Sequence, residues 1–138
     1  MKQINSQKSE VYLSTFDNSD TLLSVSEEYK NMQNICVAVK FTDILIKISP
    51  KDTCKCSWDE AIEKHSEELM SPVFWQIIGV VQTDVAKALK MLGHDELKSS
   101  WTYSEYSSNT AWTYYGGNGR MYRYIKTYSN SVRPAQEF

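Results

Sequence analysis

The residues best suited to nucleophilic or metal chemistry are few. The cysteines are Cys36, Cys54 and Cys56, and the histidines are His65 and His94. The two neighbouring cysteines do not form a CxxC motif, and a zinc site needs a full set of ligands at tighter spacing. The odd number of cysteines also argues against a disulfide framework. We therefore expect reduced structural thiols, with no bound metal ion and no cofactor.

No group of residues in the sequence forms a recognisable catalytic constellation. His65 falls inside a predicted helix and His94 follows a glycine that ends one, so we interpret both as packed or surface residues. The chain contains no nucleophile elbow, P-loop, dinucleotide-binding glycine motif or zinc-protease motif. The glycine-rich run at 116–119 is followed by neither Lys-Ser/Thr nor a predicted helix, as a phosphate loop would require. We predict that the protein is not an enzyme.

The C-terminal segment has the chemistry of a binding surface. Most of the nine tyrosines lie between positions 101 and 128, where the charged residues are Glu105, Arg120, Arg123 and Lys126. Tyrosine rings supply rigid contact area at low entropic cost, and small polar residues adapt their hydrogen bonds. A simpler interpretation is that the tyrosines are strand formers on a half-buried sheet. That interpretation does not easily explain so many tyrosines together.

Charge and hydropathy narrow the classes of partner. Single-stranded nucleic acid is bound by stacking next to a basic groove, but the net charge is −2 and few cations lie among the tyrosines. No apolar run approaches the about 20 residues that span a bilayer. Residues 1–6 also lack the apolar segment of a signal peptide. We expect no nucleic-acid or membrane partner, and a location in the cytoplasm or in a phage particle.

The length of the chain predicts one domain over residues 1–138, and the polar start predicts that residues 1–10 are disordered. The following elements must position the residues described above. Strand patterns occur at 11–13, 35–40 and 44–48, and residues 42–43 would form a hairpin or a bend in one long strand. A loosely helical pattern covers residues 19–33. Ser57 and Glu60 form a capping box that opens a helix containing Trp58 and His65.

A second helix is predicted from Pro72 to about Leu92, because proline suits a first helical position and Gly93 suits the residue after the last turn. Beyond it, residues 111–115 and 120–128 read as strands around a glycine turn at 116–119, and residues 131–135 as a final strand. Strands, two helices and then a C-terminal β-ribbon indicate the α+β class. Residues 120–126 lack a clean apolar face, which is unusual for a core strand.

The C-terminal segment carries a specific combination of motifs. Residues 101–112 read W-T-Y-S-E-Y-S-S-N-T-A-W, a glycine turn follows, and residues 126–134 read K-T-Y-S-N-S-V-R-P. This resembles the variable region of diversity-generating retroelement target proteins, whose pattern is W-S-S-x-E-Y-x-S-x-x-A-W, a glycine turn and K-x-x-S-x-x-V-R-P. Residues 57–61 and the two helices resemble the preceding scaffold more loosely. Tyr103 replaces a serine of the pattern, and Gly116 stands where an apolar residue is common.

The resemblance implies a C-type lectin fold that displays diversified side chains, with residues 101–138 as the ligand-binding segment. In that family, adenine-directed mutagenesis diversifies selected codons. The fixed frame would be Trp101, Glu105, Tyr106, Ala111, Trp112, Gly119, Lys126, Ser129, Val132, Arg133 and Pro134. The ligand-binding set would be Tyr103, Ser107, Asn109, Thr110, Thr113, Tyr115, Arg120, Tyr122, Arg123, Tyr124, Ile125 and Tyr128. Residues 123–125 would then be a binding loop.

The expected function is that of a bacterial or phage display protein whose hypervariable surface recognises a macromolecular ligand, a protein in our interpretation. The sequence motifs for calcium-dependent sugar binding are absent. The alternative is a related C-type-lectin-like or sulfatase-modifying-factor-like domain with a carbohydrate-binding or catalytic role. A structural or assembly subunit is a third interpretation, and the oligomeric state stays open.

Overall fold

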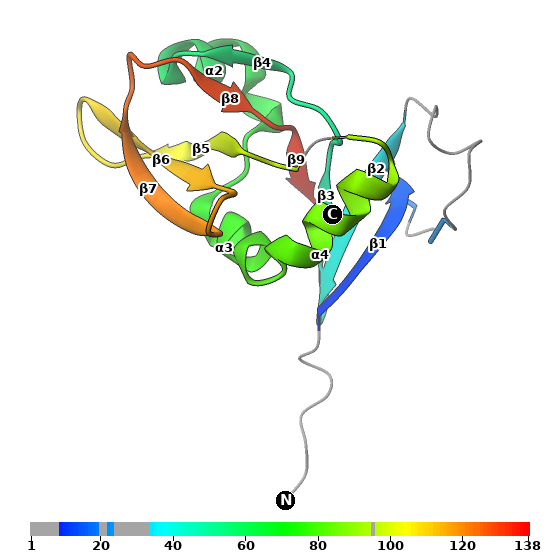
Figure 1. The fold of residues 1–138 in the computed structure, drawn as a ribbon. Coiled ribbons are helices and arrows are strands. Elements are labelled where there is room, and N and C mark those ends of the chain that lie inside the picture. The colour runs from blue at the N-terminus through cyan, green and yellow to red at the C-terminus, as the bar shows by residue number, and fades with distance from the viewer. Residues whose placement is uncertain (1–8, 20–21, 24–33, 95) are drawn as a thin grey trace, which may run out of the picture.

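The computed structural model describes residues 9–19, 22–23, 34–94 and 96–138 (Figure 1). These residues form an α+β architecture in which three α-helices accompany three antiparallel sheets, as the class prediction expected. No helix in the described part of the chain is long and apolar enough to cross a membrane. The predicted helix at 19–33 falls largely outside the described residues.

A four-stranded sheet contains the N-terminal strands and the C-terminal one, in the order β1-β2-β3-β9. Its strands are β1 (Ser9–Thr15), β2 (Ile35–Phe41), β3 (Ile44–Ile48) and β9 (Ala135–Glu137). The strands predicted at 11–13, 35–40 and 44–48 are confirmed, and β2 and β3 form a hairpin in which Thr42 has a φ of 54°. The prediction that residues 1–10 are disordered is wrong for Ser9 and Glu10, which pair with β2.

Lys47 is buried on the outer side of β3, where alternation alone would place it in solvent. Its ammonium group donates to the backbone oxygens of Thr15 at 2.8 Å and Asp17 at 2.6 Å, and to that of Ser19. The same group lies 4.5 Å from the centre of the Phe138 ring. Buried charges require such compensation. Lys47 therefore fixes the segment that follows β1 against the sheet.

The first predicted helix is confirmed as α2 (Trp58–His65), followed by a 3-10 turn, η2 (Ser66–Glu68). The Ser57 hydroxyl accepts the Glu60 amide at 3.3 Å, as the capping box predicts. The prediction of a single second helix is wrong. Two helices, α3 (Pro72–Val80) and α4 (Gln82–Met91), are separated at Val81, whose φ is −112°. The reason is tertiary, because α3 packs on β6 (Thr110–Tyr115) and β7 (Arg120–Ile125) while α4 packs on β1 and β2.

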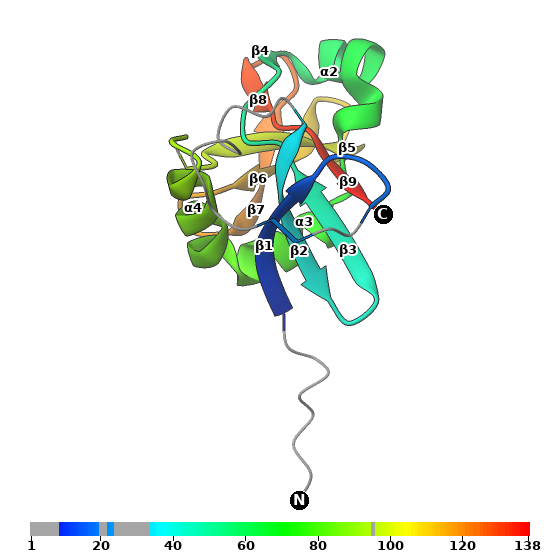
Figure 2. The same cartoon turned by 90° about the vertical axis from the view of Figure 1, so that its right-hand side faces the viewer.

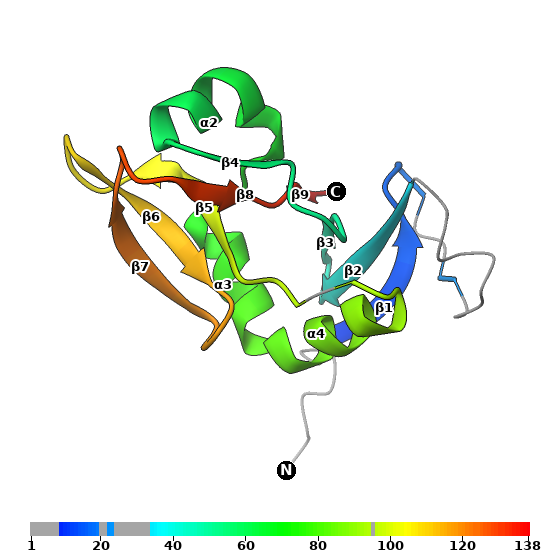
Figure 3. The same ribbon diagram turned by 45° about the horizontal axis from the view of Figure 1, so that its top comes forward.

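Two further sheets contain most of the C-terminal strands (Figures 1 and 3). One contains β5 (Ser99–Glu105), β6 (Thr110–Tyr115) and β7 (Arg120–Ile125). The predicted glycine turn connects β6 to β7. The other pairs β4 (Cys54–Cys56) with β8 (Asn130–Val132) beneath α2. The single strand predicted at 131–135 is therefore wrong. Arg133 and Pro134 separate β8 from β9, which belongs to the four-stranded sheet (Figure 2).

Two apolar cores hold these layers together. The larger one lies between the four-stranded sheet and helices α3 and α4, and it extends to Trp75 and Tyr114, whose rings stack at 4.7 Å. The smaller one lies beneath α2 and contains Ala61, Trp101 and Val132. The three-stranded sheet thus rests on α3 with one face and on the smaller core with part of the other.

Gly79 marks a very close approach between α3 and the glycine turn. A Cβ atom at Gly79 would lie 2.1 Å from the Gly119 carbonyl oxygen, which is backbone and cannot swing aside. Glycine is therefore needed here for space, in the last turn of a helix where alanine would normally be preferred. This contact holds the β6–β7 turn against the helix.

Gly79→Ala is expected to lower the free energy of unfolding by about 1–3 kcal/mol, since the clash forces α3 and the turn apart. An ordinary helical glycine-to-alanine change has the opposite sign. Gly93→Ala is the matched control, because Gly93 has a φ of 78° with no atom near the new Cβ, and should cost about 1 kcal/mol. Urea unfolding measures both. A Gly79→Ala protein more stable than wild type would contradict this packing.

Candidate ligand-binding site

Residues 123–125, expected to form a binding loop, instead belong to a regular strand. Arg123 pairs with Trp112 and Tyr124 with Ala111, so β7 is in register with β6 along its whole length. The broken alternation has a different cause. As the edge strand of its sheet, β7 leaves most of its side chains exposed on both faces.

The two faces of the three-stranded sheet have different environments. Tyr114 and Met121, which pair across β6 and β7, point toward the larger core. Burial raises the pKa of Tyr114 to about 12, so its hydroxyl stays neutral and the residue acts as a core aromatic. Thr113 and Tyr122 form the neighbouring pair and must point to the opposite face. That opposite face carries the candidate site.

A hollow of about 340 Å³ lies on this opposite face. Tyr115, Tyr122 and Tyr124 provide its aromatic walls, and Thr113 lies at its buried base. The complete lining, called the tyrosine pocket below, consists of Lys98, Ser99, Thr113, Tyr115, Tyr122, Tyr124 and Asn130. Four of the predicted ligand-binding residues therefore meet in one place, while Lys98, Ser99 and Asn130 were missed by the sequence analysis.

The tyrosine rings of the pocket are held in place by one another. Tyr115 meets Tyr122 edge to face with ring centres 5.8 Å apart, and Tyr124 meets Tyr128 in the same way at 5.5 Å. The Asn118 amide also donates to the Tyr122 hydroxyl at 2.6 Å. Such contacts reduce the rotamer freedom that each ring would lose on binding a ligand. The pocket is thus partly preorganised.

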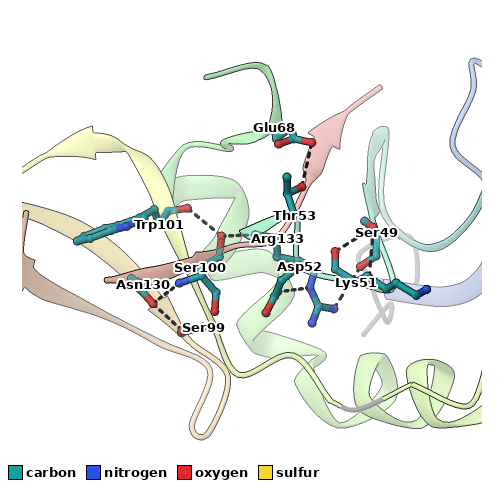
Figure 4. Close-up of polar contacts among 11 residues, drawn as sticks. Ser49, Lys51, Asp52, Thr53, Glu68, Ser99, Ser100, Trp101, Asn130 and Arg133 are labelled. Atoms are coloured by element: carbon teal, nitrogen blue, oxygen red, sulfur yellow. Dashed lines mark hydrogen bonds and ion pairs between the residues drawn. The ribbon is translucent and has the colours of Figure 1, made fainter. Parts of the chain in front are cut away.

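A buried polar network supports the floor of the tyrosine pocket (Figure 4). The Asn130 side chain accepts the Ser99 hydroxyl at 2.7 Å and donates to the Thr113 hydroxyl at 3.3 Å. Next to it, the Ser100 hydroxyl accepts the backbone amide of Arg133 at 3.0 Å. These bonds connect β8 to β5 and β6. Asn130, which follows Ser129 of the quoted C-terminal motif, is therefore part of the site.

Arg133 anchors the chain between β8 and β9. Its guanidinium donates to the Asp52 carboxylate at 2.7 Å and to the Ser49 carbonyl oxygen at 3.2 Å, as Figure 4 shows. The arginine is almost fully buried, whereas Asp52 is about one-third exposed. The Val-Arg-Pro run thus serves a structural purpose in this chain, holding the C-terminal segment to the loop before β4.

A second hollow, of about 490 Å³, adjoins the tyrosine pocket. The two share Lys98, Ser99, Tyr124 and Asn130. The charged residues that line the second hollow are the cations Lys51, Lys55, Lys98 and Arg133 and the acids Asp52 and Glu96. A local excess of positive charge therefore borders the aromatic walls, although the chain as a whole is net negative.

The remaining predicted binding residues lie elsewhere. Ser107, Asn109 and Thr110 form a hydrogen-bonded turn between β5 and β6, in which the Ser107 hydroxyl lies 2.8 Å from the Asn109 side chain. Arg123 lies 4.6 Å above the ring of Tyr106, a residue that the resemblance assigned to the fixed frame. The others are exposed to different degrees and are absent from the pocket lining: Tyr103, Arg120, Ile125 and Tyr128.

The end of β7 is tied to α2 by several residues of the expected frame. Lys126 is buried, and its ammonium group contacts Glu105 at 2.6 Å and lies 4.7 Å from the centre of a Trp58 ring. The Trp58 indole donates to the Thr102 carbonyl oxygen at 2.9 Å. These contacts hold α2 against β5 and against the end of β7. The frame residues Glu105 and Lys126 therefore have a packing role.

His65 is a packed residue, one of the two possibilities that the sequence predicted, and it has polar neighbours on both sides of its ring. It ends α2, with its Nε2 atom 3.4 Å from the Cys54 sulfur and its Nδ1 atom 3.0 Å from a Glu68 oxygen. The remaining cysteine, Cys36, is buried, and burial raises its pKa to about 12. Among the described residues, no group of three or more His, Cys, Asp and Glu side chains is arranged to hold a metal ion.

No protein-family model matches this chain, and no curated protein is significantly similar to it. The resemblance of residues 101–134 to variable proteins therefore stays a prediction from motif spacing. The function has to be argued from the geometry of the tyrosine pocket and its surroundings.

Proposed function

We propose that this protein is a non-enzymatic ligand-binding protein of the diversity-generating retroelement type, with a C-type lectin fold. The observation that carries the proposal is the tyrosine pocket, in which exposed aromatic rings surround a hollow on one face of a sheet. Ordinary sheet faces bury their aromatic residues against a core. Exposed and mutually braced tyrosines are typical of recognition surfaces.

The partner is a protein, recognised through its side chains. Tyrosine rings offer both apolar area and a hydroxyl group, which suits the mixed surface of a folded protein or a peptide. The adjoining lysines add a preference for carboxylates, since Lys51, Lys55 and Lys98 line the neighbouring hollow.

The arrangement of the chain supports the finer fold assignment. The C-terminal strand β9 joins the sheet of the N-terminal strands. The three-stranded sheet is therefore a separate sheet, inserted in the chain between strands of the four-stranded one and supported by helices. A separate sheet of this kind can tolerate changes on its exposed face, because Tyr114, Met121 and Trp101 make its contacts with the two cores. Display of variable side chains requires this separation of surface from core.

The coding DNA provides the test of the diversified character. We expect a near-copy of the sequence encoding residues 101–134 beside a reverse transcriptase gene. The copy should differ from the gene at adenines, and these should fall in codons for pocket residues such as Tyr115, Tyr122 and Tyr124. Differences confined to the buried frame, or no such copy at all, would contradict the assignment to the variable type.

A further inference from the structure

Cys54, Cys56, His65 and Glu68 form a connected group beneath α2, outside the tyrosine pocket. The two sulfur atoms are 3.5 Å apart, and the Cys54 sulfur is 3.4 Å from His65 Nε2. On the other side of the imidazole, Nδ1 lies 3.0 Å from Glu68 Oε1, an ion-pair distance without hydrogen-bond geometry. The second Glu68 oxygen accepts the Thr53 hydroxyl at 3.1 Å (Figure 4). This order of thiol, imidazole and carboxylate is that of an activated nucleophile.

The backbone explains why these side chains meet. Cys54 and Cys56 alternate with Lys55 on β4, so their side chains share one face of the strand. The chain then enters α2 at Ser57, and the helix returns His65 to the level of Cys54. The 3-10 turn after the helix places Glu68 behind the imidazole. The pairing of β4 with β8 fixes the strand beneath them.

We propose that Cys54 and Cys56 are a redox-active dithiol that reacts with disulfides, with His65 as the base and Glu68 as its positioning residue. The site is independent of the proposed ligand-binding function. Its substrate class is a small-molecule or protein disulfide, written R–S–S–R. The second sulfur at 3.5 Å distinguishes this site from a hydrolytic nucleophile, because it can resolve a mixed disulfide.

The reaction balances in two steps. His65 Nε2 accepts the Cys54 proton while the sulfur attacks R–S–S–R, and the first thiolate leaves with that proton as R–SH. The Cys56 sulfur then attacks the Cys54 sulfur of the mixed disulfide, and the second R–SH leaves with the Cys56 proton. The protein loses two electrons and two protons, which reduce R–S–S–R to two thiols, and the Cys54–Cys56 disulfide forms.

Exposure assigns the two roles. Cys54 is half-buried and reachable, whereas Cys56 is buried. Burial, followed by the hydrogen bond with Cys54, raises the pKa of Cys56 to about 12, so this thiol remains protonated until a mixed disulfide is next to it. The thiolate is the attacking form, so Cys54 beside the imidazole attacks first, and Cys56 attacks only as its proton passes to the leaving R–S⁻. Cys54 is the attacking residue and Cys56 the resolving one.

Oxidation would act on the frame of the tyrosine pocket. The Cys56 carbonyl oxygen accepts the Trp101 indole at 2.8 Å, and Cys56 pairs with Asn130, which lines the pocket. A disulfide between two residues of one strand pulls the backbone from its extended form, and strained disulfides are easily reduced. The pair therefore has the properties of a reversible site.

The test exposes the reduced full-length protein to glutathione disulfide and follows its mass. We expect the intact protein to lose the mass of two hydrogens, with peptide mapping placing the bond between Cys54 and Cys56. Cys56→Ser should instead accumulate a glutathione adduct on Cys54, and Cys54→Ser should react much more slowly. Cys36, buried in the same chain, is the internal control and should remain a thiol.

The role of His65 as a base can be tested by the pH dependence of the reaction rate, which a purely structural role of His65 would not change. In His65→Gln, and to a smaller extent in Glu68→Gln, the reaction at neutral pH should slow by about tenfold or more. The difference from wild type should vanish at high pH, where hydroxide replaces the imidazole as the base. The other charged groups that act on the pair, Glu60 and Lys64, are retained in both variants.

Two results would overturn the proposal. One is wild-type protein that forms no Cys54–Cys56 bond, whether it stays reduced or keeps a stable glutathione adduct. The other is Cys54 reacting no faster than Cys36 in the folded protein. If the bond forms but His65→Gln and wild type react equally at every pH, the assignment of His65 as base is wrong.

Discussion

Replacing Trp101 by alanine is expected to lower the free energy of unfolding by about 3–5 kcal/mol, the range for a large aromatic residue removed from a core. Its side chain is fully buried in the smaller core with Ala61, Ala111 and Val132. Its indole also donates to the Cys56 carbonyl oxygen at 2.8 Å, so the variant leaves a buried acceptor without its partner. Urea or thermal unfolding measures the change.

Phenylalanine variants separate the hydrogen bond from the packing. Trp101→Phe loses the bond to Cys56, which should cost about 1–3 kcal/mol beyond the lost area. Trp75 is the matched control, because it is also fully buried but its indole nitrogen has no hydrogen-bond partner among the described residues. Trp75→Phe should therefore cost less than Trp101→Phe. Equal losses in the two variants would contradict a structural role for the Trp101 bond.

Local sequence signals predicted the elements whose causes are local. The strands at 35–40 and 44–48 have continuous or alternating β-branched residues, and both are confirmed. The Ser57 cap and the Gly93 helix end each depend on a single residue type in a single backbone state, and both occur in the structure. The glycine turn at 116–119 similarly produced the predicted hairpin.

Elements that depend on distant partners were not predictable. The interruption at Val81 has no proline or glycine of its own and exists because α3 and α4 pack on different sheets. The separation of β8 from β9 depends on Arg133 reaching Asp52. The strand β5 was missed because polar residues surround its only large buried side chain, Trp101. For Val81 and for Arg133 the deciding contact lies far away in sequence.

The site was predictable in composition but not in geometry. The abundance of tyrosine indicated a surface, and Tyr115, Tyr122 and Tyr124 do gather around one hollow. The sequence could not say that Arg123 lies on the opposite face, since an edge strand exposed on both sides has no apolar pattern to set its register. It also could not show Asn130 at the pocket floor, because that position depends on β8 lying beside β5.

The cysteine group shows the same limit more clearly. Cys54 and His65 meet only because a short helix turns back over the strand before it. The spacing of these residues matches no motif, so the sequence analysis treated the thiols as structural. A helix length correct to within one residue would have been needed to place the imidazole beside the sulfur.

Changing Tyr122 and Tyr124 together to alanine is expected to weaken ligand binding by a hundredfold or more. Central aromatic residues of an interface typically contribute about 2 kcal/mol or more each on truncation to alanine, and about 1.4 kcal/mol corresponds to tenfold in affinity. Both rings are exposed, and both lie on the edge strand away from the larger core. Tyr124 meets the Trp101 ring edge to face at 5.8 Å, so the double variant should lose about 1 kcal/mol of stability and still be folded in the binding assay.

A second pair of tyrosines provides the matched control. Tyr103 and Tyr106 are at least as exposed as the pocket tyrosines, and neither lines the pocket. Changing both to alanine removes the same chemical groups from β5 and from the turn that follows it. If tyrosine content alone governed binding, both double variants would lose affinity equally.

The most direct measurement is the dissociation constant of a peptide selected from a random library on the wild-type protein. The same peptide is then titrated against the Tyr122/Tyr124 and the Tyr103/Tyr106 double variants. A surface centred on the tyrosine pocket predicts a loss of about a hundredfold or more for the first variant and less than about threefold for the second. Equal affinity of all three proteins, or a library that yields no binding peptide, would contradict it.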